Sequence, residues 1–270
     1  MVALTLTLLP AAAKTRINLA GLELAKLATG STAEFSRTRI STDAGAPQLG
    51  DLFRITGAGG DTIAIEGDCT HVDGIGAGLS SGTLVVNGNV GSYAGHAMTG
   101  GRLEIRGSAA DYLGAGLNGG LIHVTGKAGS FAGGQKAGER FGMAGGIILV
   151  EASIGERAGD RMRRGTIIAR GAIGAAAGSR MVGGTILTEL GFGAGPGPML
   201  RRGTLIGPKI ESLLATFADC GVHDLNILRV MSRYWAEALG PLAPRPLPLK
   251  VRRFAGDLAT LGKGELLLTA

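Results

Sequence analysis

A glycine recurs every nineteen residues through the middle of this 270-residue chain. The interval lengthens once, to twenty-six residues, where seven extra residues occupy positions 134–140. The anchoring glycines of seven successive repeats are Gly82, Gly101, Gly120, Gly146, Gly165, Gly184 and Gly203. A constant period of this kind is typical of repeat proteins, in which each unit packs only against its neighbours.

Apolar side chains occupy fixed positions between these glycines. The position two residues after each anchor reads Leu84, Leu103, Ile122, Ile148, Ile167, Ile186 and Leu205. Further apolar columns stand four, eight and sixteen residues after the anchor, and a glycine stands thirteen residues after it in nearly every repeat. Since alternate side chains of a strand point to one face, the pattern predicts a short strand after each anchor, with its apolar side chains stacked inside.

The predicted fold class is all-β, a right-handed parallel β-helix of about seven glycine-anchored coils of nineteen residues. Glycines let each coil turn through positive φ without a Cβ clash. A right-handed coil follows the general preference of crossovers between parallel strands. Nineteen is not a multiple of six, which argues against the left-handed hexapeptide helix of acyltransferases, and the sequence lacks the asparagine ladder of leucine-rich repeats.

Composition excludes several other classes of protein. Glycine fills 49 positions, more than twice its ordinary share of about 7 per cent. Only 9 prolines accompany these glycines, and no three-residue period occurs, so collagen is excluded. Hydrophobic residues make up 45% of the chain, which argues against disorder.

Charge and targeting patterns bear on partners and compartment. A formal charge of +6 permits acidic partners, whereas 4% aromatic residues and the lack of a known motif argue against nucleic acid. No run of eighteen apolar residues occurs, which predicts no contact with a membrane. Two cysteines and an N-terminus without a positively charged leader indicate a cytoplasmic protein.

The sequence divides into three predicted segments: an N-terminal cap over residues 1–50, a β-helix over residues 51–208, and a tail over residues 209–270. The cap is expected to hold a strand at residues 4–8 and a short helix near residues 19–27. Residues 51–57 and 61–67 each resemble the opening of a repeat, so the coils are expected to begin near residue 50.

A helix, a proline-rich linker and two strands are predicted after Pro208. Asp224 is expected to cap the helix, whose apolar face would hold Leu225, Leu228, Met231, Trp235 and Leu239. The linker spans residues 241–248, and a Gly-Lys-Gly turn at residues 262–264 would join the two strands.

An outward-facing column turns apolar in the later repeats. Three residues after the anchor, these repeats carry Leu149, Ile168, Leu187 and Ile206. Something should cover such a stripe. The helix of the same chain, through Trp235, is one interpretation, and a partner protein is the other; both make these five residues a predicted interface.

Catalytic and metal-binding patterns are missing from the sequence. The histidines are too scattered for metal-ligand spacing, and His123 falls at an outward position. The polar cluster at residues 68–73 coincides with a coil turn, and the glycines at residues 74–78 lack the strand-to-helix context of a phosphate-binding loop. We therefore predict neither a catalytic residue nor a metal site.

Arginines recur at three neighbouring positions of the later repeats. Three columns, each with two members, hold Arg161 and Arg180, Arg163 and Arg201, and Arg164 and Arg202. A solvated edge is one interpretation. The other is a strip that binds carboxylates of a partner protein or of an acidic cofactor tail, with Arg161, Arg163, Arg180 and Arg201 as candidate contacts.

Residues 50–268 resemble a known family. The segment 119–126 reads Gly-Gly-Leu-Ile-His-Val-Thr-Gly, a coil motif shared with the C-terminal domain of the glutamate synthase large subunit. Met-Leu-Arg-Arg-Gly at residues 199–203, Arg-Phe-Ala-Gly-Asp at 253–257 and Gly-Lys-Gly-Glu at 262–265 resemble the end of the C subunit of formylmethanofuran dehydrogenases. The alanine- and arginine-rich composition favours the bacterial form, the C subunit of the formyltransferase/hydrolase complex of methylotrophs.

The resemblance implies a scaffold subunit without an active site. Such a complex converts formyl-tetrahydromethanopterin to formate in one-carbon metabolism, and its carrier is methanofuran or methylofuran with a polyglutamate tail. The implied partners are an amidohydrolase-like subunit, a formyltransferase subunit and one further subunit, and no cofactor is expected on this chain alone. The alternatives are the C subunit of a molybdenum or tungsten dehydrogenase and a structural domain of the glutamate synthase type.

Overall fold

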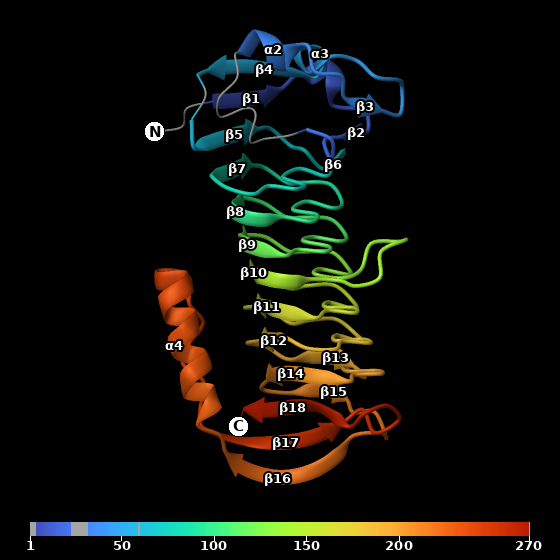
Figure 1. Cartoon of the computed structure of the whole chain (residues 1–270), viewed down its shortest axis with the longest axis vertical. Helices are drawn as coiled ribbons and strands as arrows, with labels where there is room; N and C mark the ends of the chain where they lie inside the picture. The colour runs from blue at the N-terminus through green and yellow to red at the C-terminus, as the bar shows by residue number, and fades with distance from the viewer. Residues whose placement is uncertain (1–3, 23–31, 59, 270) are drawn as a thin grey trace.

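Most strands of the protein lie in one sheet (Figure 1). The computed structural model describes residues 4–22, 32–58 and 60–269. Within them, thirteen strands follow the order β16-β17-β18-β14-β12-β11-β10-β9-β8-β7-β5-β1-β4. The central members are β5 (Thr62–Glu66), β7 (Thr83–Asn87), β8 (Thr99–Ile105), β9 (Gly119–Val124), β10 (Ala144–Val150), β11 (Arg164–Ala169), β12 (Thr185–Thr188) and β14 (Arg202–Gly207).

Central strands pair in parallel with the register that the glycine period predicts. Leu84 lies opposite Leu103, and Leu103 opposite Ile122. The column continues in register to Leu205, also across the repeat lengthened by the insertion. The predicted column two residues after each anchor is therefore confirmed.

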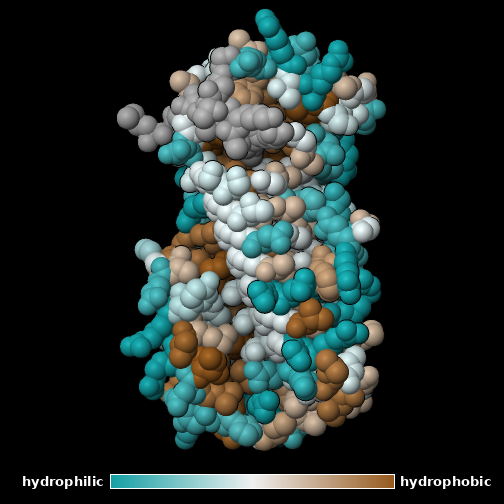
Figure 2. Space-filling model, viewed as in Figure 1, coloured by the Kyte–Doolittle hydropathy of each residue, from teal (hydrophilic) through white to brown (hydrophobic). Residues whose placement is uncertain are grey.

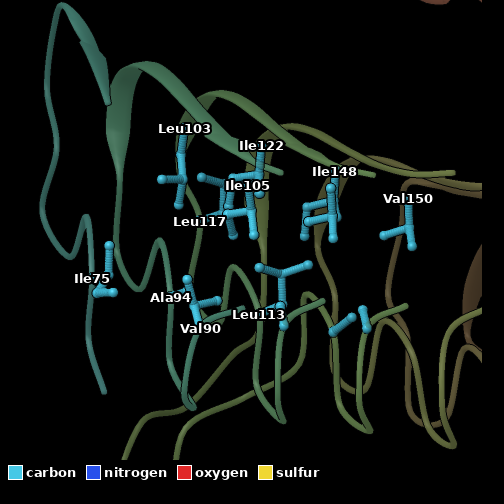
Figure 3. Packing of buried hydrophobic residues seen from close by; sticks show 14 of the residues in the cluster. Ile75, Val90, Ala94, Leu103, Ile105, Leu113, Leu117, Ile122, Ile148 and Val150 are labelled. Carbon is cyan, nitrogen blue, oxygen red and sulfur yellow. The ribbon is translucent and has the colours of Figure 1, made fainter. Parts of the chain in front are cut away.

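A second line of contacts stacks the column eight residues after the anchor. Parallel bridges join Cys69, Val90, Ala109, Ala128, Ile154, Ile173 and Phe192 in turn. Between the two lines lies the core, in which the methionines of the column sixteen residues after the anchor are fully buried. Figure 3 shows Leu103, Ile122 and Ile148 following one another beneath the strands, with Val90 and Leu113 facing them from the turns.

The two cysteines are expected to differ sharply in reactivity. Cys69 is inaccessible, and burial, assisted by the nearby negative charge of Asp68, raises the pKa of its thiol to about 12. Cys220 is exposed. Because the thiolate is the nucleophile, a disulfide reagent at pH 8 should titrate one thiol in the native chain and two in urea. Equal native reactivity of both thiols would contradict the burial of Cys69.

Glycine is required at the anchors because neighbouring backbones approach closely. Gly120 has φ +86°, and a Cβ built on it would lie 2.6 Å from the carbonyl oxygens of Gly100 and Gly101. In the column thirteen residues after the anchor, a Cβ on Gly114 would lie 2.6 Å from Ile148 Cδ1. One glycine column therefore permits the backbones to stack, and the other leaves room for the core isoleucines.

The N-terminal segment joins the sheet directly. The predicted strand is β1 (Leu4–Leu8), which pairs in parallel with β5 and antiparallel with β4 (Phe53–Gly57). Residues 51–57 therefore do not open a repeat as predicted, because β4 turns back along β1 as an antiparallel edge strand. The helix predicted near residues 19–27 falls largely on residues 23–31, which lie outside the described part, and Leu19–Leu22 are not helical.

Short elements complete this end of the molecule. They are the 3₁₀ turn η1 (Pro10–Ala12), the strands β2 (Ile17–Asn18), β3 (Ser41–Thr42) and β6 (Val72–Asp73), and the helices α2 (Thr32–Ser36) and α3 (Leu49–Leu52). β2 lies between β3 and β6 in a small second sheet.

The C-terminal segment extends the stack before it closes it. β18 (Lys263–Thr269) pairs in parallel with β14, and β17 (Lys250–Gly256) and β16 (Ala218–Asp224) follow as antiparallel neighbours. A further strand, β15 (Ile210–Ser212), pairs with β13 (Phe192–Ala194). The predicted strand pair is confirmed, but its turn spans residues 257–262, because Lys263 and Gly264 already belong to β18.

The predicted helix is α4 (Ile227–Leu239), followed by the 3₁₀ turn η2 (Gly240–Leu242) and the predicted linker. Two strands precede α4, so the tail does not turn helical directly after Pro208. Asp224 does not cap the helix, since it ends β16 opposite Lys250, and the N-cap residue is Asn226. Within the described residues, no helix is long and apolar enough to cross a membrane.

Helix α4 covers the outward apolar column. Its buried residues Leu228, Trp235 and Leu239 form a second hydrophobic cluster. From the sheet this cluster includes Leu149, Ile168, Leu187 and Ile206, all at most 3% exposed. The five predicted interface residues therefore meet one another within the chain, and α4 lies along the sheet as Figure 1 shows.

Candidate functional site

Three of the predicted arginines line a hollow of about 340 Å³. We call it the arginine hollow; its lining residues are Arg140, Phe141, Arg161, Arg180, Val182, Met199 and Arg201. Arg161 and Arg180 occupy the same position in adjacent repeats, and both have a left-handed φ of 54°. This shared backbone conformation, which is uncommon for residues other than glycine, gives the two side chains equivalent starting directions.

Asp160 fixes one side of the hollow. Its carboxylate is 3% exposed and accepts hydrogen bonds from an Nη atom of Arg180 at 2.9 and 3.2 Å. Arg157 approaches the same carboxylate at 3.6 Å. Arg180 is therefore held in place by a buried counter-charge, and its charge is balanced within the chain.

An aromatic ring forms one wall of the hollow. Phe141 has the guanidinium of Arg163 at 4.5 Å from its ring centroid and that of Arg140 at 5.0 Å. Such cation–π contacts restrict the orientation of both guanidinium groups. Arg163 packs against Phe141 but is not one of the lining residues.

Positive charge in the hollow exceeds negative charge. Among the residues that the structure describes, Arg140, Arg161, Arg163 and Arg201 form no ion pair. The Nε atom of Arg161 is also buried without a hydrogen-bond partner in the described chain. An electropositive concavity with unpaired guanidinium groups is suited to carboxylate ligands, which can accept two parallel hydrogen bonds from one arginine.

The seven-residue insertion supplies the parts of this site that the sequence interpretation missed. Glu139 reaches back to His96, with 2.7 Å between its Oε1 atom and the histidine Nε2 atom. Lys136 lies 5.5 Å from the ring centroid of Tyr93, the first ring of the stacked series Tyr93, Tyr112 and Phe131. These contacts hold the loop against earlier repeats and thereby place Arg140 and Phe141 at the hollow.

The remaining predicted arginines lie elsewhere. Arg164 begins β11 and Arg202 begins β14, and both are exposed outside the lining of the hollow. A second hollow of about 330 Å³ adjoins the first and shares Arg180 and Met199 with it. The predicted strip is thus divided. Arg161, Arg180 and Arg201 line the hollow, Arg163 packs against its aromatic wall, and Arg164 and Arg202 lie outside it.

His123 lies opposite Leu149 in the outward column, as its spacing predicts, but it is buried. It is 7% exposed, and its Nε2 atom lies 3.1 Å from Glu151 Oε1. Arg170 pairs with the other oxygen of Glu151 at 2.5 Å and donates a hydrogen bond to the carbonyl of Leu242. This row of charges ties the sheet to the turn after α4. No group of three or more metal-binding side chains gathers in the described ranges.

Fold and site together define a glycine-anchored β-repeat protein with an arginine-lined hollow and a docked outer helix. No protein-family model matches the chain. It is 42% identical over 255 residues to the C subunit of the formyltransferase/hydrolase complex Fhc of Methylorubrum extorquens, covering 94% of this chain and 96% of that protein. The chain therefore belongs to the family formed by the C subunits of formyltransferase/hydrolase complexes.

A solved structure shows the same likeness. It is the crystal structure of the formyltransferase/hydrolase complex FhcABCD from Methylorubrum extorquens in complex with methylofuran. One of its chains matches this protein with a TM-score of 0.88 and 39% identity, over 98% of this chain and 99% of that chain. The similarity thus includes both ends of the molecule as well as the central repeats.

Proposed function

We propose that this chain is the C subunit of a cytoplasmic formyltransferase/hydrolase complex, which converts formyl-tetrahydromethanopterin to formate through a methanofuran-type carrier. The observation that carries the proposal is a match of 42% identity across almost the full length of both proteins. Its partners would be an amidohydrolase-like subunit, a formyltransferase subunit and one further subunit. The name of the solved relative, a complex of several subunits with methylofuran, supports this assignment.

The chain's part in such a complex is that of a non-catalytic scaffold. We interpret the stack as a right-handed parallel β-helix over residues 51–208, flanked by a cap over residues 1–50 and a tail over residues 209–270. Parallel neighbours in register at nineteen-residue steps support this interpretation. Stacked repeats make a rigid rod with long outer faces, which suits it to holding other subunits at fixed separations.

Activity of the separated chain tests the scaffold role. The purified chain should release no formate from formyl-tetrahydromethanopterin above the uncatalysed rate, while the complex that contains it should do so readily. Turnover by the chain alone would contradict a non-catalytic role. The matched control is the complex assembled from the other subunits without this chain.

Arg161, Arg163, Arg180 and Arg201 are proposed to contact an acidic chain, either the tail of the carrier or an acidic segment of a partner. The unpaired guanidinium groups of the arginine hollow support this role. Arg180 would contribute less than Arg161 or Arg201, since Asp160 already balances its charge. Phe141 and Arg163 would form one wall of the binding site.

Charge reversal tests this contact. The double variant Arg161→Glu/Arg201→Glu is expected to bind a hexaglutamate probe about tenfold or more weakly than the unchanged chain. The substitutions remove two guanidinium donors of charge-assisted hydrogen bonds and place carboxylates that repel the probe in their stead. The probe's fluorescence anisotropy measures the effect. Arg164→Glu/Arg202→Glu is the matched control, because it makes the same change of charge in the same two repeats outside the hollow. Equal loss in both variants would mean that the hollow has no specific part in binding.

A further inference from the structure

Helix α4 carries a second apolar face that nothing in the described chain covers. Ile227, Val230 and Tyr234 are 54%, 59% and 54% exposed, and Val222 of the preceding strand β16 is 69% exposed. The three helical positions follow the spacing i, i+3 and i+7, which places them on one side of the helix. We call these four residues the outer ridge.

The outer ridge differs from the face that holds α4 to the sheet. Leu228, Trp235 and Leu239 are at most 6% exposed against the sheet. The proline-rich linker is also engaged on the inner side, where the backbone N–H of Leu247 donates to Ser232 Oγ at 3.0 Å. Figure 2 shows apolar residues on the surface where Figure 1 places α4. Large apolar residues on a surface are usually scattered singly, so three on one side of a helix, with a fourth in the strand that precedes it, indicate a binding surface.

Charged residues beside the ridge indicate the chemistry of its partner. Arg229 and Arg233 lie one helical turn apart on the exposed flank, and neither forms an ion pair with a residue that the structure describes. A complementary surface would offer an apolar groove to the ridge and carboxylates along the edge of the groove that faces these arginines. Tyrosine and arginine are also the residue types that most often dominate binding energy at interfaces.

We propose that the outer ridge inserts into an apolar groove, rimmed with carboxylates, on a sister subunit of the complex. The inference rests on the proposed function, because it requires that the chain assembles with other subunits. A second copy of this chain suits the surface less well, since the chain carries a net charge of +6 and the flank of the ridge carries unpaired arginines. The relative of known structure comes from a complex of several different subunits.

Charged substitutions on the ridge should weaken assembly. In the complex produced by co-expression of all subunits, Val230→Glu/Tyr234→Glu is expected to lower the affinity of this chain for the others by about tenfold or more. Leu258→Glu/Leu261→Glu is the matched control, because it adds the same charge at two exposed apolar residues of the turn 257–262, outside α4 and its charged flank. Thermal unfolding of each isolated variant reports whether its fold is retained.

The charged flank provides an independent variant. Arg229→Glu/Arg233→Glu should slow association with the sister subunit. The difference in rate from the unchanged chain should become smaller as salt is raised, because the two arginines attract the partner through long-range electrostatics. Normal assembly of both the folded ridge variant and the folded flank variant would overturn the proposal. Loss of a homodimer by the ridge variant, with unchanged binding to the other subunits, would also overturn it and assign the ridge to self-association. If even the unchanged chain binds no sister subunit, the proposed function fails rather than the choice of surface alone.

Discussion

Alanine at Gly120 is expected to lower the free energy of unfolding by about 4 kcal/mol. A left-handed residue with a Cβ costs about 1–2 kcal/mol by itself. The remainder arises because the new Cβ would lie 2.6 Å from two carbonyl oxygens of the preceding repeat. The backbones cannot separate without weakening the adjacent hydrogen bond from Asn118 N–H to the Met98 carbonyl, which is 2.8 Å long.

Gly138→Ala is the control that separates the two contributions. Gly138 has φ +88°, almost the value of Gly120, but a Cβ on it would meet nothing within 4 Å. Its substitution should therefore cost only the conformational penalty of about 1 kcal/mol. Urea denaturation followed by circular dichroism measures both variants. Equal effects of the two substitutions would show that close approach of repeats does not determine the anchor glycines.

Replacing Trp235 with alanine should lower the free energy of unfolding by a similar amount, about 4 kcal/mol. Trp235 is 2% exposed and belongs to the cluster between α4 and the sheet. Its removal would leave a cavity within this cluster and loosen the helix that covers the outward column. It is also the only tryptophan of the chain, so the emission of the unchanged protein should shift to the red when α4 detaches in urea.

Tyr234→Ala provides the matched comparison on the same helix. Tyr234 is 54% exposed and belongs to the outer ridge. Its loss should change the stability of the isolated chain by about 0.5 kcal/mol or less, while it should weaken binding of a sister subunit. A large loss of stability in the isolated Tyr234→Ala chain would mean that the ridge packs within the chain.

The central repeats could be predicted from sequence because each one meets the same surroundings. The column from Leu84 to Leu205 keeps one chemical character, and its strands pair in the expected register. Even the seven-residue insertion leaves the pairing of Ile148 with Ile122 unchanged. A periodic structure fixes each position by its neighbours, so a periodic sequence suffices to locate it.

The ends were less predictable because tertiary pairing outweighs local preference there. Asp224 is a favourable N-cap residue by type, but strand pairing opposite Lys250 holds it in β16. Residues 51–57 resemble a repeat, yet β1 pairs with them in the antiparallel direction. In both cases the deciding partner lies far away in the sequence, where no local pattern reports it.

Only part of the candidate site could be predicted, because the rest again depends on contacts between residues far apart in the sequence. Arg161, Arg180 and Arg201 lie in three successive repeats and were found by their columns. Arg140 and Phe141 depend on the path of the inserted loop, which the contact between Glu139 and His96 sets across 43 residues of sequence. The outer ridge was missed because α4 has two apolar faces and only the one containing Trp235 was recognised.

Affinity purification of the tagged chain from its own host tests the scaffold role most directly. We expect recovery of an amidohydrolase-like subunit and a formyltransferase subunit in a constant ratio, together with a methanofuran-type carrier. Mass spectrometry identifies the proteins, and formate release measures the activity of the assembly. A chain recovered alone, or with molybdenum- or tungsten-containing partners, would contradict the assignment to a formyltransferase/hydrolase complex.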